Sequence, residues 1–139
     1  MQVFLISGEI SGDTHGAELI ASLQQRLPEA EFRGLGGPNM RVKAPEIEDW
    51  LDEAAVLGIV EVLKKYGYFR RKLNETVEAI LASNPAVVIP IDYPGFNLRL
   101  AKAIRKRGYR GKIAYYISPQ VWAWKRGRIK EMAKMLDLM

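Results

Sequence analysis

The sequence predicts an α/β fold of the Rossmann-like type, a mostly parallel sheet with helices on both faces. Short apolar runs alternate along the chain with stretches of helical periodicity, which favours strands joined by crossover helices. One run, AVVIPI at 86–91, is continuously apolar, as is typical of a strand covered on both faces. The expected strands are 2–7, 31–35, 86–92 and 112–118, and the expected helices are 14–27, 53–66, 69–83, 97–107 and 125–135.

The first expected strand ends in a loop rich in serine and glycine, Ser7–Thr14, before a helix begins. Gly8 and Gly12 allow a tight turn and a close approach of the backbone to a ligand. We expect Asp13 or Ser11 to cap the helix, whose free N–H groups attract anions. The loop has neither the G-x-G-x-x-G dinucleotide fingerprint nor the Gly-Lys-Ser/Thr of a Walker loop.

Two carboxylates stand at the ends of expected strands. Glu9 follows the first strand, where it is either a hydrogen-bond acceptor in the turn or a site residue. Asp92 ends the strand at 86–91, and the spacing allows either a turn-initiating aspartate or a general base at the edge of a ligand crevice. Pro90 argues against a long central hydrogen-bond ladder in this strand.

The last expected strand runs into Ser118–Trp124, where Pro119 stops it. Trp122 and Trp124 are interpreted either as core packing or as lining of the crevice at the carboxyl ends of the strands. Residues 136–139 resemble the opening of a further strand, so we expect the chain to be truncated before a second domain.

The composition suits one soluble domain. The chain has 139 residues, 48% of them hydrophobic, and no cysteine, which excludes disulfides and thiolate chemistry. No apolar run approaches the roughly 18 residues of a membrane span, and we expect no signal peptide because the first strand starts at Gln2. His15 is the only histidine, and we expect no metal site.

Positive charge gathers in the last third of the chain. Residues 99–134 hold 12 Lys or Arg and one Glu, although the whole chain carries a net charge of only +5. This pattern suits phosphate groups, an anionic membrane or nucleic acid, or else a solvated helix face.

Five segments in this order resemble the N-terminal half of the lipid-A-disaccharide synthase family, which has the two-domain GT-B fold. They are Ser7–Asp13 (SGEISGD), Gly36–Met40 (GGPNM), Leu57–Leu63 (LGIVEVL), Ile91–Asn97 (IDYPGFN) and Ser118–Trp124 (SPQVWAW). One position departs from the family, because Gly95 stands where a second acid is frequent, and we interpret that acid as replaceable.

The resemblance implies a glycosyltransferase that joins UDP-2,3-diacylglucosamine to 2,3-diacylglucosamine 1-phosphate and releases UDP, without a cofactor or metal. Residues 1–139 would form the acceptor-binding domain, and the nucleotide-sugar domain would lie outside this chain. Asp92 would be the base and Glu9 would assist it. The residues expected to bind substrate are Ser7, Gly8, Ser11, Gly12, Asp13, Asn97, Ser118, Gln120, Trp122 and Trp124.

The resemblance also favours a membrane role for residues 57–72, which mix apolar and basic side chains and otherwise predict an ordinary packed amphipathic helix. The residues expected at the membrane or acyl chains are Val60, Val62, Leu63, Lys64, Lys65, Arg70 and Arg71. The expected location is cytoplasmic, peripheral on the anionic inner face of the inner membrane, and the resemblance allows a homodimer of the full-length protein.

Two other classes stay open from the sequence. One is a different GT-B nucleotide-sugar enzyme, such as an epimerase or another glycosyltransferase. The other is a non-enzymatic module that binds an anionic membrane or nucleic acid through residues 99–134. We expect no nucleic-acid partner, because the aromatic residues of this region fall in strand and crevice positions rather than in an exposed stacking row.

Overall fold

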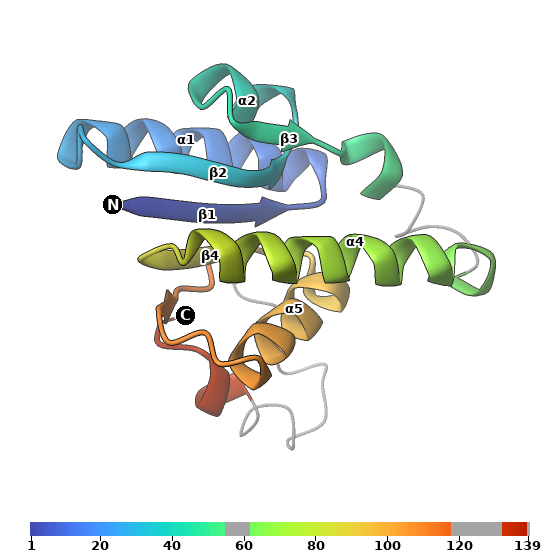
Figure 1. Cartoon of the computed structure of the whole chain (residues 1–139). Coiled ribbons are helices and arrows are strands. Elements are labelled where there is room, and N and C mark those ends of the chain that lie inside the picture. Colours follow the sequence, from blue (N-terminus) through green and yellow to red (C-terminus); the bar gives the residue numbers. More distant parts are fainter. Residues whose placement is uncertain (55–61, 118–131, 139) are drawn as a thin grey trace.

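The computed structural model describes residues 1–54, 62–117 and 132–138, and for 62–66 it describes the backbone. The elements in chain order are β1 (Gln2–Ser7), α1 (Ile10–Arg26), β2 (Glu31–Gly36), α2 (Pro38–Lys43), β3 (Ile47–Asp49), α4 (Val62–Ser83), β4 (Val87–Ile91), α5 (Pro94–Lys106) and β5 (Lys112–Ile113). The strands form one parallel sheet in the order β3-β2-β1-β4-β5 (Figure 1). The α/β fold with a parallel sheet is confirmed.

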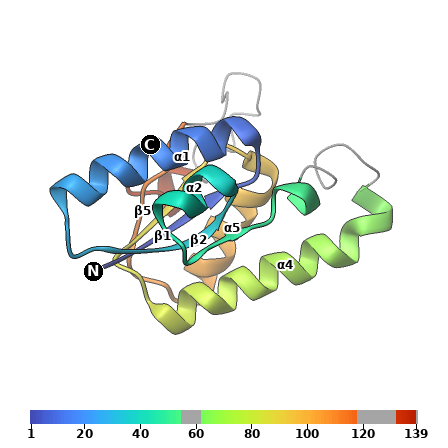
Figure 2. The same ribbon diagram turned by 90° about the horizontal axis from the view of Figure 1, so that it is seen from above.

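The alternation of side chains along β1 divides the core into two halves. Val3 and Leu5 belong to the cluster under α1 and α2, whereas Phe4 and Ile6 belong to the cluster under α4 and α5. Figure 2 shows α1 and α4 on opposite sides of the strands. Helices therefore cover both faces, as the apolar run in β4 predicts.

The side of the sheet on which successive strands are added changes at β1. The chain moves from β1 to β2 and β3 on one side, and then places β4 and β5 on the other side. Ser7 at the end of β1 is the register partner of Ile91 at the end of β4. Open α/β sheets bind ligands in the crevice outside the carboxyl ends of the strands at such a switch point. The loops that follow β1 and β4 meet here.

Several expected boundaries are wrong. α1 begins at Ile10 rather than at 14. α5 begins at Pro94 rather than at 97, because proline is suited to the first turn of a helix. Gly67 does not divide two helices: α4 runs through it from Val62 to Ser83. The sequence also gives no warning of the short elements α2 and β3. None of the helices within the described ranges is long and apolar enough to cross a membrane.

The edge of the sheet at β5 is shorter than the expected strand 112–118. β5 contains two residues, and beyond it a single bridge joins Tyr116 to Ile91. The left-handed backbone of Ile117, with φ of 59°, ends the extended conformation. Pro90 lies in β4 and lacks an N–H for this edge, although its carbonyl accepts from the Tyr116 N–H at 2.8 Å. Along the outer side of β5, Leu138 forms a parallel bridge with Ala114, where the sequence predicts the opening of a further strand.

Candidate functional site

Two carboxylates from distant parts of the chain lie together at the switch point. Glu9 follows β1 and Asp92 follows β4, and these strands are hydrogen-bonded neighbours. Partial burial raises the pKa of Glu9, and the negative charge of Asp92 raises it further. The sequence places the two residues at separate strand ends, and the order of the strands brings them into electrostatic contact.

Asp92 is held by its backbone. Its φ is 44°, in the left-handed region that residues with a Cβ rarely adopt. Its N–H donates to the carbonyl of Tyr116 at 3.1 Å. Its carbonyl accepts from the Tyr115 hydroxyl at 2.6 Å and from the Asn97 amide Nδ2 at 2.7 Å. The residue is half-buried. The N-cap of α5 is Tyr93, which makes no side-chain cap hydrogen bond, and the hydrogen bonds of Asp92 given above are all made by its backbone.

Tyr93 continues the left-handed turn, with φ of 49°, and its side chain is buried. Its hydroxyl donates to the carbonyl of Ala54 at 2.9 Å, and its ring meets the ring of Trp50 edge-on at 6.0 Å between centroids. Burial, followed by the charge of Glu9, raises the pKa of Tyr93 to about 12. Tyr93 therefore stays a neutral hydrogen-bond donor beside the carboxylates at physiological pH.

The glycines of the first loop make room for protein atoms. A Cβ added at Gly8 would lie 2.6 Å from the Tyr93 ring, and one at Gly12 would lie 2.4 Å from the Ser7 hydroxyl oxygen. Ser7 is fully buried, and its carbonyl accepts from the Trp50 indole N–H at 2.6 Å. Neighbouring side chains therefore approach the backbone of this loop closely, and the contact of Gly8 and Gly12 with substrate stays a prediction.

The Asp13 carboxylate binds the start of a different helix from the one expected. The prediction that Asp13 or Ser11 caps α1 is wrong, because the N-cap is Glu9 and it makes no side-chain bond. The Asp13 carboxylate is 1% exposed and accepts from the backbone N–H groups of Gly37, Asn39 and Met40, each at 2.9 Å. It thus satisfies the free N–H groups at the start of α2.

Asn97, expected to bind substrate, is completely buried. Its Nδ2 donates to carbonyls at the ends of both β1 and β4: Ile6 at 3.3 Å, Ile91 at 3.3 Å and Asp92 at 2.7 Å. Its Oδ1 is buried without a hydrogen-bond partner in the described part of the chain. Asn97 therefore ties the two strands together beneath the site.

The remaining expected residues are distributed as follows. Ser11 is exposed on α1, and His15 is exposed one turn later. The described ranges contain no group of three His, Cys, Asp or Glu residues that could hold a metal ion. Val62, Leu63, Lys64 and Lys65 lie in the first turn of α4, described by its backbone. Val60, Ser118, Gln120, Trp122 and Trp124 lie outside the described residues.

In the N-terminal half of α4, two aromatic side chains face the core and two arginines are exposed. Tyr68 and Phe69 pack against the core, and Phe69 meets Phe96 edge-on at 5.5 Å between ring centroids. Arg70 and Arg71 are exposed. The N-terminal part of α4 projects beyond the carboxyl edge of the sheet (Figures 1 and 2), on the side where β1 ends.

Part of the basic region has a structural role. The Arg105 guanidinium donates to the carbonyls of Tyr109, Gly111 and Met135 and to the carboxylate of Asp137. A backbone hydrogen bond from Ile113 lowers the pKa of Asp137, with Arg105 contributing. Arg107 pairs with Glu78 at 2.8 Å. Lys106 and Arg110 are exposed. Arg105 thereby fixes residues 132–138 against β5.

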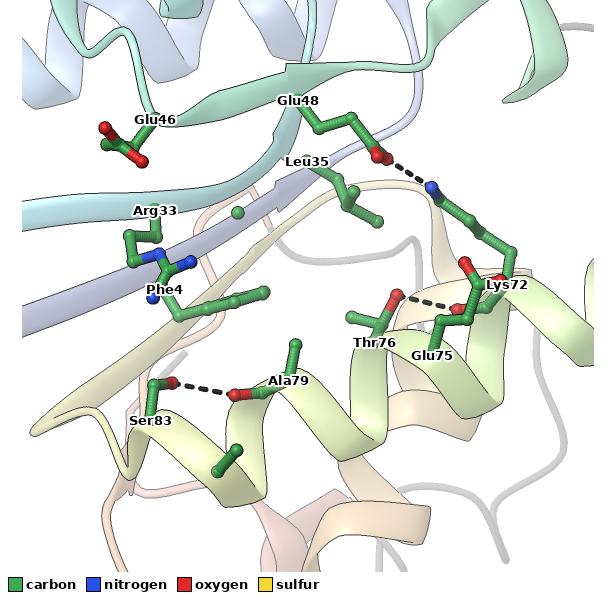
Figure 3. A pocket seen from close by; sticks show the side chains of 12 residues that line it. Phe4, Arg33, Leu35, Glu46, Glu48, Lys72, Glu75, Thr76, Ala79 and Ser83 are labelled. Carbon is green, nitrogen blue, oxygen red and sulfur yellow. Dashed lines mark hydrogen bonds and ion pairs between the residues drawn. The ribbon is translucent and has the colours of Figure 1, made fainter.

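A groove in the described structure lies away from the carboxylates. This groove, of about 530 Å³, lies between β2, β3 and α4 (Figure 3). Lys72 spans part of it to pair with Glu48, and its ammonium lies 5.9 Å from the centre of the Trp50 ring. None of the predicted site residues lines this groove, so the switch point is the better candidate site.

Comparison with known proteins gives a single result. A family model described as lipid-A-disaccharide synthetase matches residues 3–139, nearly the whole chain. The chain belongs to the lipid-A-disaccharide synthetase family. Among its relatives, the lipid-A-disaccharide synthases of Ruegeria pomeroyi and Coxiella burnetii are each 42% identical over 137 residues, and that of Trichlorobacter lovleyi is 42% identical over 138. These matches cover 99% of this chain but 34%, 36% and 36% of the relatives, so the chain spans about a third of their length.

In this member of the lipid-A-disaccharide synthetase family, three buried aromatic residues that are not among the expected site residues surround the switch point. Trp50, Tyr93 and Tyr115 each donate a side-chain hydrogen bond to a backbone carbonyl, at 2.6, 2.9 and 2.6 Å. Their acceptors lie between 23 and 43 residues away along the chain. The order Asp-Tyr in the family motif places Tyr93 next to Asp92, but no sequence signal links Trp50 or Tyr115 to the site.

Proposed function

We propose that this chain forms the acceptor and base side of a lipid-A-disaccharide synthase. The whole protein would join UDP-2,3-diacylglucosamine to 2,3-diacylglucosamine 1-phosphate, and would release UDP. Family membership supports the reaction class, and the paired carboxylates at the switch point support the place where it occurs.

The observation that carries the proposal is the position of Asp92. It directly follows β4 at the switch point, where open α/β sheets bind ligands, and Tyr93 rather than Asp92 is the N-cap of α5. In the transfer, Asp92 takes the proton of the acceptor hydroxyl while the hydroxyl oxygen attacks the anomeric carbon of the donor. The bond from that carbon to the UDP oxygen breaks, and UDP leaves with the electron pair. Glu9 orients the acceptor or shares the proton.

The test measures UDP release and disaccharide formation by a full-length protein that contains this chain. Asp92→Asn should keep the fold and reduce the rate by about 10²–10⁴-fold, the usual contribution of a general base. Glu9→Gln should be the next most damaging change. Glu48→Gln, in the groove away from the switch point, is the control and should keep the rate. An Asp92→Asn rate within threefold of the parent would refute the base assignment, and a different product would indicate another nucleotide-sugar enzyme.

The two substrates would be divided between this chain and the rest of the protein. The chain carries the carboxylates and no dinucleotide fingerprint or Walker loop. We therefore expect residues 1–139 alone to bind an acceptor analogue weakly, to bind UDP hardly at all, and to transfer no sugar. Calorimetry with each compound tests this division, and tight UDP binding by residues 1–139 would contradict it.

The acylated substrates also suggest that the protein works at a membrane surface. The N-terminal part of α4 projects at the same edge of the sheet as the carboxylates, with Arg70 and Arg71 exposed (Figure 1). A basic surface next to apolar side chains favours peripheral binding to an anionic membrane. In this proposal α4 faces the cytoplasmic side of the inner membrane, so that acyl chains stay in the lipid while the sugars reach Glu9 and Asp92.

A further inference from the structure

The backbone carbonyl of Asp92 is the meeting point of three elements. Asp92 follows β4, Asn97 comes from α5, and Tyr115 comes from the segment after β5. The Tyr115 hydroxyl and the Asn97 amide donate to this one oxygen at 2.6 and 2.7 Å. Both donors are almost without solvent access, at 3% and 0% exposure, so the two bonds are formed inside the protein.

These bonds hold a backbone that would otherwise relax. Asp92 and Tyr93 are consecutive residues in the left-handed region, with φ of 44° and 49°, and neither is glycine. Such conformations persist where the surrounding structure fixes them. Because both the N–H and the carbonyl of Asp92 are hydrogen-bonded, the backbone of this residue is held in place, and with it the direction of its Cα–Cβ bond.

We propose that Tyr115 is a positioning residue for Asp92: with Asn97, it holds the Asp92 carbonyl and so aims the carboxylate at the acceptor. The inference rests on the proposed role of Asp92 as the base. Tyr115 would touch no substrate and would act only through Asp92. Burial and the nearby Asp92 charge raise the pKa of Tyr115, which keeps its hydroxyl protonated as a donor.

The chain offers a matched control. Tyr109 is 4% exposed, and its hydroxyl donates to the carbonyl of Pro85 at 2.8 Å. Pro85 precedes β4, so this bond lies at the opposite end of the strand from Asp92. Tyr115→Phe and Tyr109→Phe each remove one buried hydroxyl bonded to a backbone carbonyl, and each keeps the ring.

The experiment compares both variants in a full-length protein that contains this chain. Both should lower Tm by similar amounts. Tyr115→Phe should reduce kcat by about 10- to 100-fold with KM within about twofold, the effect expected when a reacting group is displaced by a fraction of an ångström to an ångström. Tyr109→Phe should keep kcat. If Tyr115→Phe keeps kcat, or if both variants lose it equally, the inference is wrong.

A double variant separates this inference from the proposed function. If Tyr115 acts through Asp92, adding Tyr115→Phe to Asp92→Asn should change kcat by less than about twofold, since residues that act as a unit are not additive. A full additional loss in the double variant would show that Tyr115 acts elsewhere, and would overturn the inference while leaving Asp92 as the base. An Asp92→Asn variant with the parental rate would overturn both.

Discussion

The aromatic ring of Tyr93 lies directly against the backbone of Gly8. A Cβ at position 8 would be 2.6 Å from two ring carbons, a distance that real Cβ contacts essentially never show. This contact closes the first loop over the turn that follows β4. It also explains why the loop after β1 needs a residue without a side chain at this position.

Gly8→Ala should therefore destabilise the protein by about 1–3 kcal/mol, the usual effect of overpacking a core. Gly95→Ala is the control, because a Cβ there has no neighbour within 4 Å and the residue lies in the first turn of α5. That change should be neutral or stabilising by up to about 1 kcal/mol. Urea denaturation of both variants checks the difference, and equal stabilities would contradict it.

Glu9 makes the folded state sensitive to pH. Burial and the charge of Asp92 raise the pKa of Glu9 above 4.5, so the folded state binds this proton more tightly than the unfolded state. Its contribution to stability is present below the unfolded pKa and is lost as the pH rises through the folded pKa. Glu9→Gln removes this loss, so Tm at pH 7 should exceed that of the parent, and the gain should vanish at about pH 3.5.

The same measurement in an Asp92→Asn background gives the control. Without the Asp92 charge, the second cause of the raised pKa of Glu9 is gone. Glu9→Gln should then raise Tm at pH 7 by less than it does in the parent. An equal gain in both backgrounds would mean that the two carboxylates do not interact.

Asp13→Asn should weaken the fold substantially. The carboxylate accepts from three backbone N–H groups, and an asparagine would turn an N–H₂ donor towards some of them. Leaving buried donors unsatisfied should lower the free energy of unfolding by about 2–4 kcal/mol. Glu18→Gln, exposed on the same helix, should stay within about 0.5 kcal/mol of the parent. A mild effect of Asp13→Asn in chemical denaturation would argue against its role at the start of α2.

The proposed membrane surface on α4 can be tested by charge reversal. Arg70→Glu with Arg71→Glu should reduce co-sedimentation of the full-length protein with anionic vesicles, and added salt should weaken what binding is left. Lys106→Glu with Arg110→Glu changes the net charge equally at other exposed positions. If both pairs reduce binding to the same extent, overall charge rather than α4 explains it. Val60→Ser with Val62→Ser and Leu63→Ser should weaken binding as well if apolar residues insert.

The sequence predicts the long elements of the fold because each carries a full period of its pattern. β1 and β4 are apolar runs, and α1 and α5 have clear apolar faces. β3 escapes prediction because it has three residues, two of them acidic, and pairs only because β2 is already in place. α2 has six residues, and the Asp13 carboxylate, 24 to 27 residues away, binds its first N–H groups. Contacts over such separations leave no local trace in the sequence.

In the candidate site too, the sequence predicts local features but not the contacts between distant residues. Glu9 and Asp92 can be found from sequence, since each follows an apolar strand. That they lie together depends on the order of the strands, which the sequence does not specify. Asp13 and Asn97 are expected to bind substrate, and in the structure both form hydrogen bonds with backbone groups. A polar residue in a motif can serve the backbone as well as a ligand, so their contact with substrate stays a prediction.

The way in which Asp92 is held has a consequence for protein engineering. The residue is held through its own backbone N–H and carbonyl, so a change of side chain at position 92 leaves these hydrogen bonds in place. Glycine adopts the left-handed conformation at φ of 44° without penalty. Asp92→Gly should therefore keep the local backbone and remove only the carboxylate. A small carboxylic acid supplied in solution, such as formate, could then occupy the vacated space and restore part of the lost proton transfer. The basicity of the catalytic group would then be set by the choice of the added acid.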